Sequence, residues 1–306
     1  MPIYNIEHTL KAVKEKPFKL EKDIQPFVEA NMTTLLNLQF IKTEFSIGHF
    51  RIDSLAFDTE KNAFVIIEYK RDKNLSVIDQ GYAYLSLMLN NKADFILEYN
   101  EVMSKSLKRS DVDWTQSRVI FISPRFTAYQ KEAINFKDLP IELYEIRRYE
   151  NKTVSFDRII NGNPTESIKT ITKQNKAATE VNEEVKVYAE QDHTQKTSDE
   201  MREVYAELRQ RLLDAGDSVT VYPKKMTIGF KVDNNVFCDI VFLKKELKMY
   251  LNLKHGDLED PKKLTRDVSS TGHWGNGDYQ INLTGEEDMD YIMFLVNQVL
   301  KSIAAK

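Results

Sequence analysis

The segment FRIDSLAFDTEKNAFVIIEYK, residues 50–70, has the pattern of a β-hairpin, with two apolar runs on either side of the polar turn TEKN at 59–62. Each run carries a charge that an apolar strand does not need: Asp53 in the first, and Glu68 and Lys70 in the second. Because side chains two residues apart on a strand point to the same face, Glu68 and Lys70 share one face of the sheet. Charges gathered on an apolar sheet are costly unless they bind something, so the hairpin also predicts a site.

The neighbouring sequence predicts alternating helices and strands. Residues 22–36 have the spacing of an amphipathic helix, in which Pro26 is tolerated only in a first turn that starts near Asp23. The remaining expected elements are strands at 39–47, 50–58 and 63–70, a helix at 75–90, apolar runs at 94–99, 118–123 and 141–146, and a polar or helical stretch from Thr127 to Phe136. This order of helix, three strands, helix and strand predicts a mixed α/β domain with a central sheet over residues 1–160.

Residues 161–197 are polar, with few large apolar side chains and no sustained period, and they predict a linker that is partly helical. A small α+β domain is expected over residues 198–306. Its expected elements are a helix that starts at a capping box from Thr197 to Glu200 and ends at Gly216, strands at 218–222, 226–232, 236–243 and 247–253, a short helix after Pro261, a turn and strand at 272–283, and a helix at 286–303.

The composition of the 306 residues is that of a globular protein, with 42% hydrophobic and 29% charged residues. No apolar run approaches the 18 residues of a membrane span, the first residues lack the apolar core of a signal peptide, and Cys238 is the only cysteine. We therefore expect a cytoplasmic protein without a membrane partner. The net charge of −4 is not concentrated in a basic block, so nucleic acid would be bound through a local patch.

Oxygen ligands from the hairpin are of the kind that a hard divalent cation prefers. Asp53 and Glu68 lie at hairpin distance, so each can give an oxygen to one Mg²⁺, with Mn²⁺ as a substitute. The carbonyl of Tyr69 can add a third ligand, and water fills the rest because Mg²⁺ gives up its water reluctantly. Such a metal lowers the pKa of a bound water and neutralises charge on a phosphate oxygen.

Three further side chains complete the candidate catalytic site. Lys70 shares the face of Glu68 and can position the attacking water or stabilise the transition state. Gln80, on the helix that follows, can orient water or a phosphate. Glu29, on the leading helix and off its apolar stripe, can hold a second metal or bind Lys70.

This set of residues resembles the signature of the PD-(D/E)XK nuclease superfamily: Asp53, Glu68-x-Lys70, the trailing Gln80 and the helix residue Glu29. The resemblance covers roughly residues 20–125 and is greatest to restriction-endonuclease-like proteins and to the archaeal branched- and mismatch-DNA endonucleases. One departure is Ile52, where the signature has a proline. The resemblance implies an αβββαβ core and Mg²⁺-dependent hydrolysis of phosphodiester bonds, with DNA as the expected substrate and partner.

The C-terminal domain resembles a small domain of unknown function that follows such nuclease-like domains. The resemblance rests on residues 251–253 (LNL), 266–268 (RDV) and 272–279 (GHWGNGDY). It implies no activity, and we expect a recognition or oligomerisation module, the latter as a homodimer.

Less specific interpretations stand beside these. A Glu-x-Lys pair on a strand is common, and an exposed ion pair explains it equally well. The alternative function is a non-catalytic module that retains the nuclease fold and binds nucleic acid or a protein. A purely structural partner protein is a third interpretation, to which the lack of a basic surplus gives some support.

Other conspicuous residues have ordinary explanations. Arg71 and Lys73 can contact phosphates beside Lys70, or they can belong to a solvated strand end. His273 and Trp274 can form a binding edge, although we expect Trp274 to pack against its own domain. The dispersed histidines and lone cysteine do not suit a zinc site, and Cys238 is expected to be a small buried hydrophobe.

Overall fold

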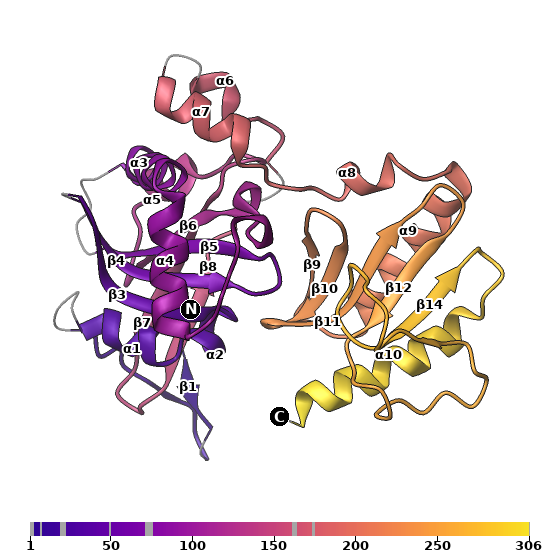
Figure 1. Cartoon of the computed structure of the whole chain (residues 1–306). Coiled ribbons are helices and arrows are strands. Elements are labelled where there is room, and N and C mark those ends of the chain that lie inside the picture. Colours follow the sequence, from indigo (N-terminus) through magenta and orange to yellow (C-terminus); the bar gives the residue numbers. More distant parts are fainter. Residues whose placement is uncertain are drawn as a thin grey trace. The chain divides into compact units, whose positions relative to one another are not determined.

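The computed structural model describes residues 3–6, 8–18, 23–48, 50–70, 76–160, 164–172 and 175–305. The chain divides into two compact units, Met1–Val187 and Tyr188–Lys306, each with its own sheet and core (Figure 1). Both are built from helices and strands, which confirms the mixed α/β class.

A mixed six-stranded sheet forms the centre of the N-terminal unit, in the order β3-β4-β5-β6-β7-β8. Its strands are β3 (Gln39–Ile47), β4 (Phe50–Asp58), β5 (Ala63–Tyr69), β6 (Arg118–Ser123), β7 (Ile141–Arg148) and β8 (Val154–Arg158). The β3–β4–β5 meander and the β7–β8 pair are antiparallel, whereas β5, β6 and β7 run parallel. Parallel neighbours need a crossover, and helices supply it here.

Helices lie on both faces of this sheet. They are α1 (Ile24–Ala30), α2 (Met32–Leu36), α3 (Val77–Asn90), α4 (Lys92–Met103) and α5 (Ala128–Ala133), with 3₁₀ turns η2 (Arg109–Asp111) and η3 (Trp114–Gln116). The helix expected over 22–36 is broken at Asn31, whose side chain donates to the Phe27 carbonyl at 2.7 Å and so competes with the helical bond pattern. The apolar run at 94–99 belongs to α4.

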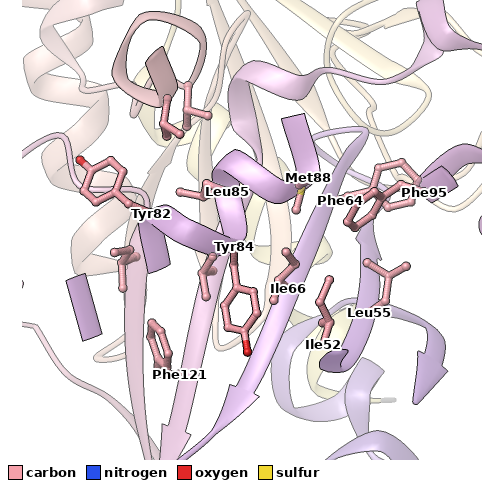
Figure 2. Packing of buried hydrophobic residues seen from close by; sticks show 14 of the residues in the cluster. Ile52, Leu55, Phe64, Ile66, Tyr82, Tyr84, Leu85, Met88, Phe95 and Phe121 are labelled. Atoms are coloured by element: carbon pink, nitrogen blue, oxygen red, sulfur yellow. The ribbon is translucent and has the colours of Figure 1, made fainter. Parts of the chain in front are cut away.

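The two faces of the sheet are covered by two separate apolar clusters. On one face α3 and α4 pack on β4, β5 and β6, and Figure 2 shows Tyr84, Leu85 and Met88 of α3 directed toward the strands that carry Ile66 and Phe121. On the other face α1 and α2 pack through an apolar set that includes Val28 and Ile67. Because both faces are covered, β5 is buried over its whole length, as its continuous apolar run predicts.

Residues 164–187 extend the first unit, whereas the sequence pattern predicts a linker over 161–197. Helices α6 (Lys169–Thr172) and α7 (Lys176–Glu184) form there, and α7 packs against α3, where the Tyr82 hydroxyl donates to Asn182 Oδ1 at 2.8 Å. Ala178 and Val181 are buried one helical turn apart, a short apolar stripe within an otherwise polar segment. A two-stranded sheet, β1 (Tyr4–Asn5) with β2 (Lys11–Ala12), completes the unit.

The C-terminal unit has an antiparallel six-stranded sheet in the order β13-β14-β12-β11-β10-β9. Its strands are β9 (Val219–Pro223), β10 (Ile228–Val232), β11 (Asn235–Phe242), β12 (Leu247–Leu251), β13 (Arg266–Asp267) and β14 (Tyr279–Leu283). Helices α9 (Asp199–Asp214) and α10 (Met289–Ala304) bury one face of this sheet, and the short α8 (Gln191–Thr194) precedes them (Figure 1).

Two local predictions in this unit are corrected. The N-cap of α9 is Ser198, which accepts from the Met201 N–H at 3.3 Å, whereas the Thr197 hydroxyl donates to the Leu243 carbonyl at 2.6 Å. The stretch after Pro261 is a turn and not a helix, because Lys263 has a φ of 53° and the chain then folds back. No helix in the described part of the chain is long and apolar enough to cross a membrane.

Candidate functional site

The β4–β5 hairpin brings the first two predicted residues together. Ser54 pairs with Ile67 and Leu55 with Ile66, a register that places Asp53 across from Glu68. Beyond this point the backbone pairing is replaced by a side-chain contact, because the Tyr69 N–H donates to Asp53 Oδ2 at 3.0 Å. The carboxylate of Asp53 is therefore fixed at the carboxyl end of β5.

Lys70 and Gln80 join Glu68 on the same side of the sheet. The Lys70 ammonium and the Gln80 amide both donate to Glu68 Oε1, at 3.1 and 2.9 Å. The Gln80 amide also lies 3.3 Å from the hydroxyl of Tyr84, one turn along α3. Glu68 and Lys70 are buried, so this is not the exposed ion pair of the less specific interpretation.

The negative charges of Asp53 and Glu68 are not fully balanced by the positive charge of Lys70. Burial, together with the nearby Glu68 carboxylate, raises the pKa of Asp53 to about 6, although the Tyr69 N–H and the Lys70 ammonium oppose that rise. Two carboxylates share one ammonium here, and the second negative charge is only partly compensated. An additional cation would relieve this repulsion.

Two buried oxygen atoms at the same place have no hydrogen-bond partner among the described residues: Glu68 Oε2 and Gln80 Oε1. Buried polar atoms in native proteins are nearly always paired, so unpaired ones point to a water or an ion as their partner. Within the described ranges, no three His, Cys, Asp or Glu side chains gather closely enough to hold a metal by themselves. That is compatible with Mg²⁺, which is often held by one or two carboxylates and keeps several waters. The donor set thus fits the expected ion.

Glu29 lies on α1, and α1 packs on the face of the sheet opposite to the one that α3 covers. Its Oε1 accepts from the Ser54 hydroxyl at 2.6 Å and from the Gln25 amide at 3.0 Å. The Ser54 hydroxyl also lies 3.2 Å from that of Tyr69, whose ring belongs to the apolar cluster on the α1 face of the sheet. The structure therefore pairs Glu29 with Ser54 and Gln25 and does not bring it to Lys70, in contrast to the sequence expectation.

The residues that sequence reasoning missed are those that support the site. Gln25 donates to the Asp53 carbonyl at 2.8 Å, and Ser54 lies 3.2 Å from the Tyr69 hydroxyl. Tyr84 lies four residues after Gln80, and Gln25 four before Glu29, so helical i, i+4 spacing is the signal that could have found both. Arg71 and Lys73 fall outside the described residues.

The raised pKa of Asp53 predicts a pH-dependent effect on stability. A carboxyl whose pKa is higher in the folded state destabilises that state above about pH 6, and the penalty fades as pH falls toward 4. In metal-free buffer at pH 8 we expect Asp53→Asn to raise the free energy of unfolding by about 1–2 kcal/mol, because solvent screens part of the effect. Urea denaturation at pH 8 and pH 4 measures it, and an equal gain at both values would contradict the assignment.

The C-terminal unit departs from one expectation and agrees with another. Trp274 has 64% of its surface exposed, so it does not pack against the core of its domain as expected. Cys238 is fully buried, and burial raises the pKa of its thiol, as is typical of a small core side chain.

Fold and site together define a two-unit mixed α/β protein with an acidic site at the end of a mixed sheet. Its sequence is 47% identical over 292 residues to a protein of Haemophilus influenzae described as an "uncharacterized protein", and the match covers 95% of this chain and 96% of that one. The chain belongs to the same family as that protein. Residues 190–298 match the model of a domain of unknown function, DUF5655, which covers most of the C-terminal unit.

Solved structures with some likeness cover about half of the chain. A complex of EndoMS with double-stranded DNA is 12% identical and has a TM-score of 0.25, and the match covers 47% of this chain and 64% of the EndoMS chain. A repair endonuclease from Pyrococcus abyssi is 15% identical, with 43% and 59% covered and a TM-score of 0.22. SfsA from Pyrococcus furiosus, in complex with Ca²⁺, is 12% identical, with 50% and 77% covered and a TM-score of 0.23. At these TM-scores the likenesses carry no argument about the activity of this chain.

Proposed function

We propose that the N-terminal unit is a Mg²⁺-dependent nuclease that hydrolyses phosphodiester bonds, with DNA as the expected substrate. The observation that carries the proposal is the unpaired state of Glu68 Oε2 and Gln80 Oε1 in a buried site beside Asp53. The order α1, α2, β3, β4, β5, α3, α4, β6 supports it, since it contains the αβββαβ arrangement that the motif resemblance implies.

Asp53, Glu68 and the Tyr69 carbonyl are the groups that would hold Mg²⁺, or Mn²⁺ in its place. A bound ion would supply Lewis-acid polarisation of the phosphate and of the attacking water. The chain's own contribution is to fix the two carboxylates before the ion arrives. The Tyr69 N–H holds one oxygen of Asp53, and Lys70 and Gln80 hold one oxygen of Glu68.

We assign to Lys70 the stabilisation of the transition state. Its ammonium carries three protons, of which one is donated to Glu68 at 3.1 Å. The other two can orient the attacking water and donate to a phosphate oxygen on which negative charge develops. Because the ammonium lies in a buried setting, its charge is screened less than it would be in bulk water.

Gln80 is the residue that we assign to water positioning. Its amide nitrogen is held by Glu68 and Tyr84, so its free Oε1 has a fixed direction. A carbonyl oxygen of this kind accepts a hydrogen bond from water and limits its orientation.

A cleavage assay with the full chain tests the proposal. Labelled duplex, single-stranded and branched DNA, and RNA, are incubated with Mg²⁺, with Mn²⁺ and with EDTA. We expect cleavage of a DNA substrate that needs the metal and stops with EDTA. Binding of nucleic acid by the wild-type chain without metal-dependent cleavage of any substrate would contradict the proposal and favour the non-catalytic module.

A further inference from the structure

A pocket lies in the C-terminal unit, on the face of the sheet that α9 and α10 leave open. The cavity has a volume of about 580 Å³ and is bordered by β11, β12, β13 and β14 and by the loop at 271–274. This volume falls within the range of small-molecule pockets, about 300–1,000 Å³. The chemistry of the N-terminal site makes no use of this pocket.

An aromatic wall forms one side of the pocket. The rings of Tyr250 and His273 are stacked, with centroids 4.9 Å apart and planes within 10°. The two ring nitrogens of His273 lie 2.7 and 2.9 Å from the carbonyl oxygens of Thr271 and Gly277, which fixes the plane of the imidazole. Trp274 follows directly, lines the same pocket and keeps 64% of its surface exposed.

The loop that presents Trp274 is packed tightly on the sheet. A Cβ at Gly275 would overlap the ring of Tyr250, and a Cβ at Gly277 would overlap the Leu251 carbonyl. Gly277 also has a φ of 88°, which side chains rarely allow. The Asn276 N–H donates to the buried Asp239 carboxylate at 3.0 Å. The packing of this loop therefore fixes the position of Trp274 at the pocket.

Two cationic side chains line the same pocket. Arg266 is exposed and has no ion-pair partner among the described residues. Lys248 lies 3.6 Å from Glu246, a distance typical of a weak surface pair. The buried Asp239 is already paired with Lys224 at 2.8 Å, so it leaves little negative charge facing the cavity. The pocket thus combines flat aromatic surface with net positive charge.

We infer that this pocket binds a nucleotide unit, with the base stacked on Trp274 and the phosphate at Arg266 and Lys248. Stacking on exposed aromatic rings beside basic side chains is how single strands are held without a sequence code. The inference goes beyond the proposed nuclease activity, because it concerns the other unit and needs no metal.

Intrinsic fluorescence tests the inference directly, because the chain has only two tryptophans. Trp114 is buried in the N-terminal unit, so a base that stacks in the pocket quenches Trp274 alone. The full chain is titrated in EDTA with adenosine monophosphate and with ten-nucleotide oligo(dA). Binding of the oligonucleotide is also followed by anisotropy of a terminal dye. We expect saturable quenching that disappears in Trp274→Phe.

Variants separate stacking from a general effect on the fold. We expect Trp274→Ala to weaken oligonucleotide binding by about 5- to 100-fold, and Trp274→Phe to retain most of it, because a phenyl ring still stacks. Arg266→Gln should weaken binding and reduce its dependence on salt. Phe294→Ala, at an exposed aromatic on α10, is the matched control and should bind as the wild type does.

The two probes distinguish the source of the nucleotide. Comparable affinities for adenosine monophosphate and oligo(dA) indicate a site for a free nucleotide. Much tighter binding of oligo(dA) indicates a site for a nucleic-acid strand. Absence of quenching by either probe, or equal affinities of wild type and Trp274→Ala, would overturn the inference and leave a protein partner as the occupant to seek. Because these titrations contain EDTA, their outcome is independent of whether the chain cleaves DNA.

Discussion

We expect metal-dependent cleavage to slow by about 10²- to 10³-fold when Asp53 is replaced by asparagine or Glu68 by glutamine. Each change keeps the shape of the side chain and removes one of the two negative charges that would hold the ion. In the Asp53→Asn variant the amide oxygen can still accept the Tyr69 N–H, so the hairpin should stay intact. Lys70→Met should have an effect of similar size, because it removes the ammonium 3.1 Å from Glu68.

The matched control for these variants is Asp79→Asn. Asp79 is an exposed carboxylate on α3, next to Gln80 in sequence, and its side chain lies outside the site. Its replacement also removes one negative charge, so it separates an effect on the site from an effect of net charge. Cleavage by Asp53→Asn at the wild-type rate, with purity confirmed by mass spectrometry, would contradict the assignment of the site.

Phe64→Ala should have the largest effect on stability in the N-terminal unit. Phe64 is fully buried on β5, and its ring lies 5.1 Å from that of Phe57, 5.6 Å from Phe95 and 5.4 Å from Trp114. Removing it leaves a cavity at the centre of this aromatic cluster, and such changes cost about 3–5 kcal/mol. Figure 2 shows Phe64 beside Phe95 in the packed layer under α3 and α4.

The fluorescence of Trp114 gives a local readout for this prediction. In a Trp274→Phe background, urea denaturation followed by tryptophan emission reports on the N-terminal unit alone, which avoids mixing the transitions of two units. Phe50→Ala is the control, since this phenylalanine on β4 is 44% exposed and should change stability by less than about 0.5 kcal/mol. A similar loss in both variants would contradict the packing described for Phe64.

The strands β3, β4 and β5 could be predicted from the sequence because short-range rules determine them, whereas β8 (Val154–Arg158) was not predicted. The turn residues and apolar runs give β3 and β4 the bounds predicted, 39–47 and 50–58. The pairing of Asp53 with Glu68 follows from the same hairpin. Gln80 could be placed because it lies in the first turn of a helix that begins soon after β5.

Features that depend on tertiary packing were not predictable in this way. Glu29 and Gln80 both lie on helices, but the side of the sheet on which each helix packs is set by long-range contacts, and α1 takes the face opposite α3. The polar stretch around α7 shows few apolar residues, yet four of them (Ile168, Ala178, Val181 and Val185) are buried in the core of the first unit, where α7 packs against α3. The position of Trp274 is set by its loop, which packs on the sheet through Gly275 and Gly277 and through the Asn276 N–H bonded to the Asp239 carboxylate. A single sequence does not reveal these tertiary contacts.

Calorimetric titration of the full chain with Mn²⁺ tests the metal site most directly, because its readout does not depend on substrate or turnover. We expect saturable binding to one site in the wild type, its loss in Asp53→Asn, and its retention in Glu29→Gln, whose carboxylate lies on the other face of the sheet. Absence of saturable binding in the wild type, or binding by Asp53→Asn with wild-type affinity, would contradict the account.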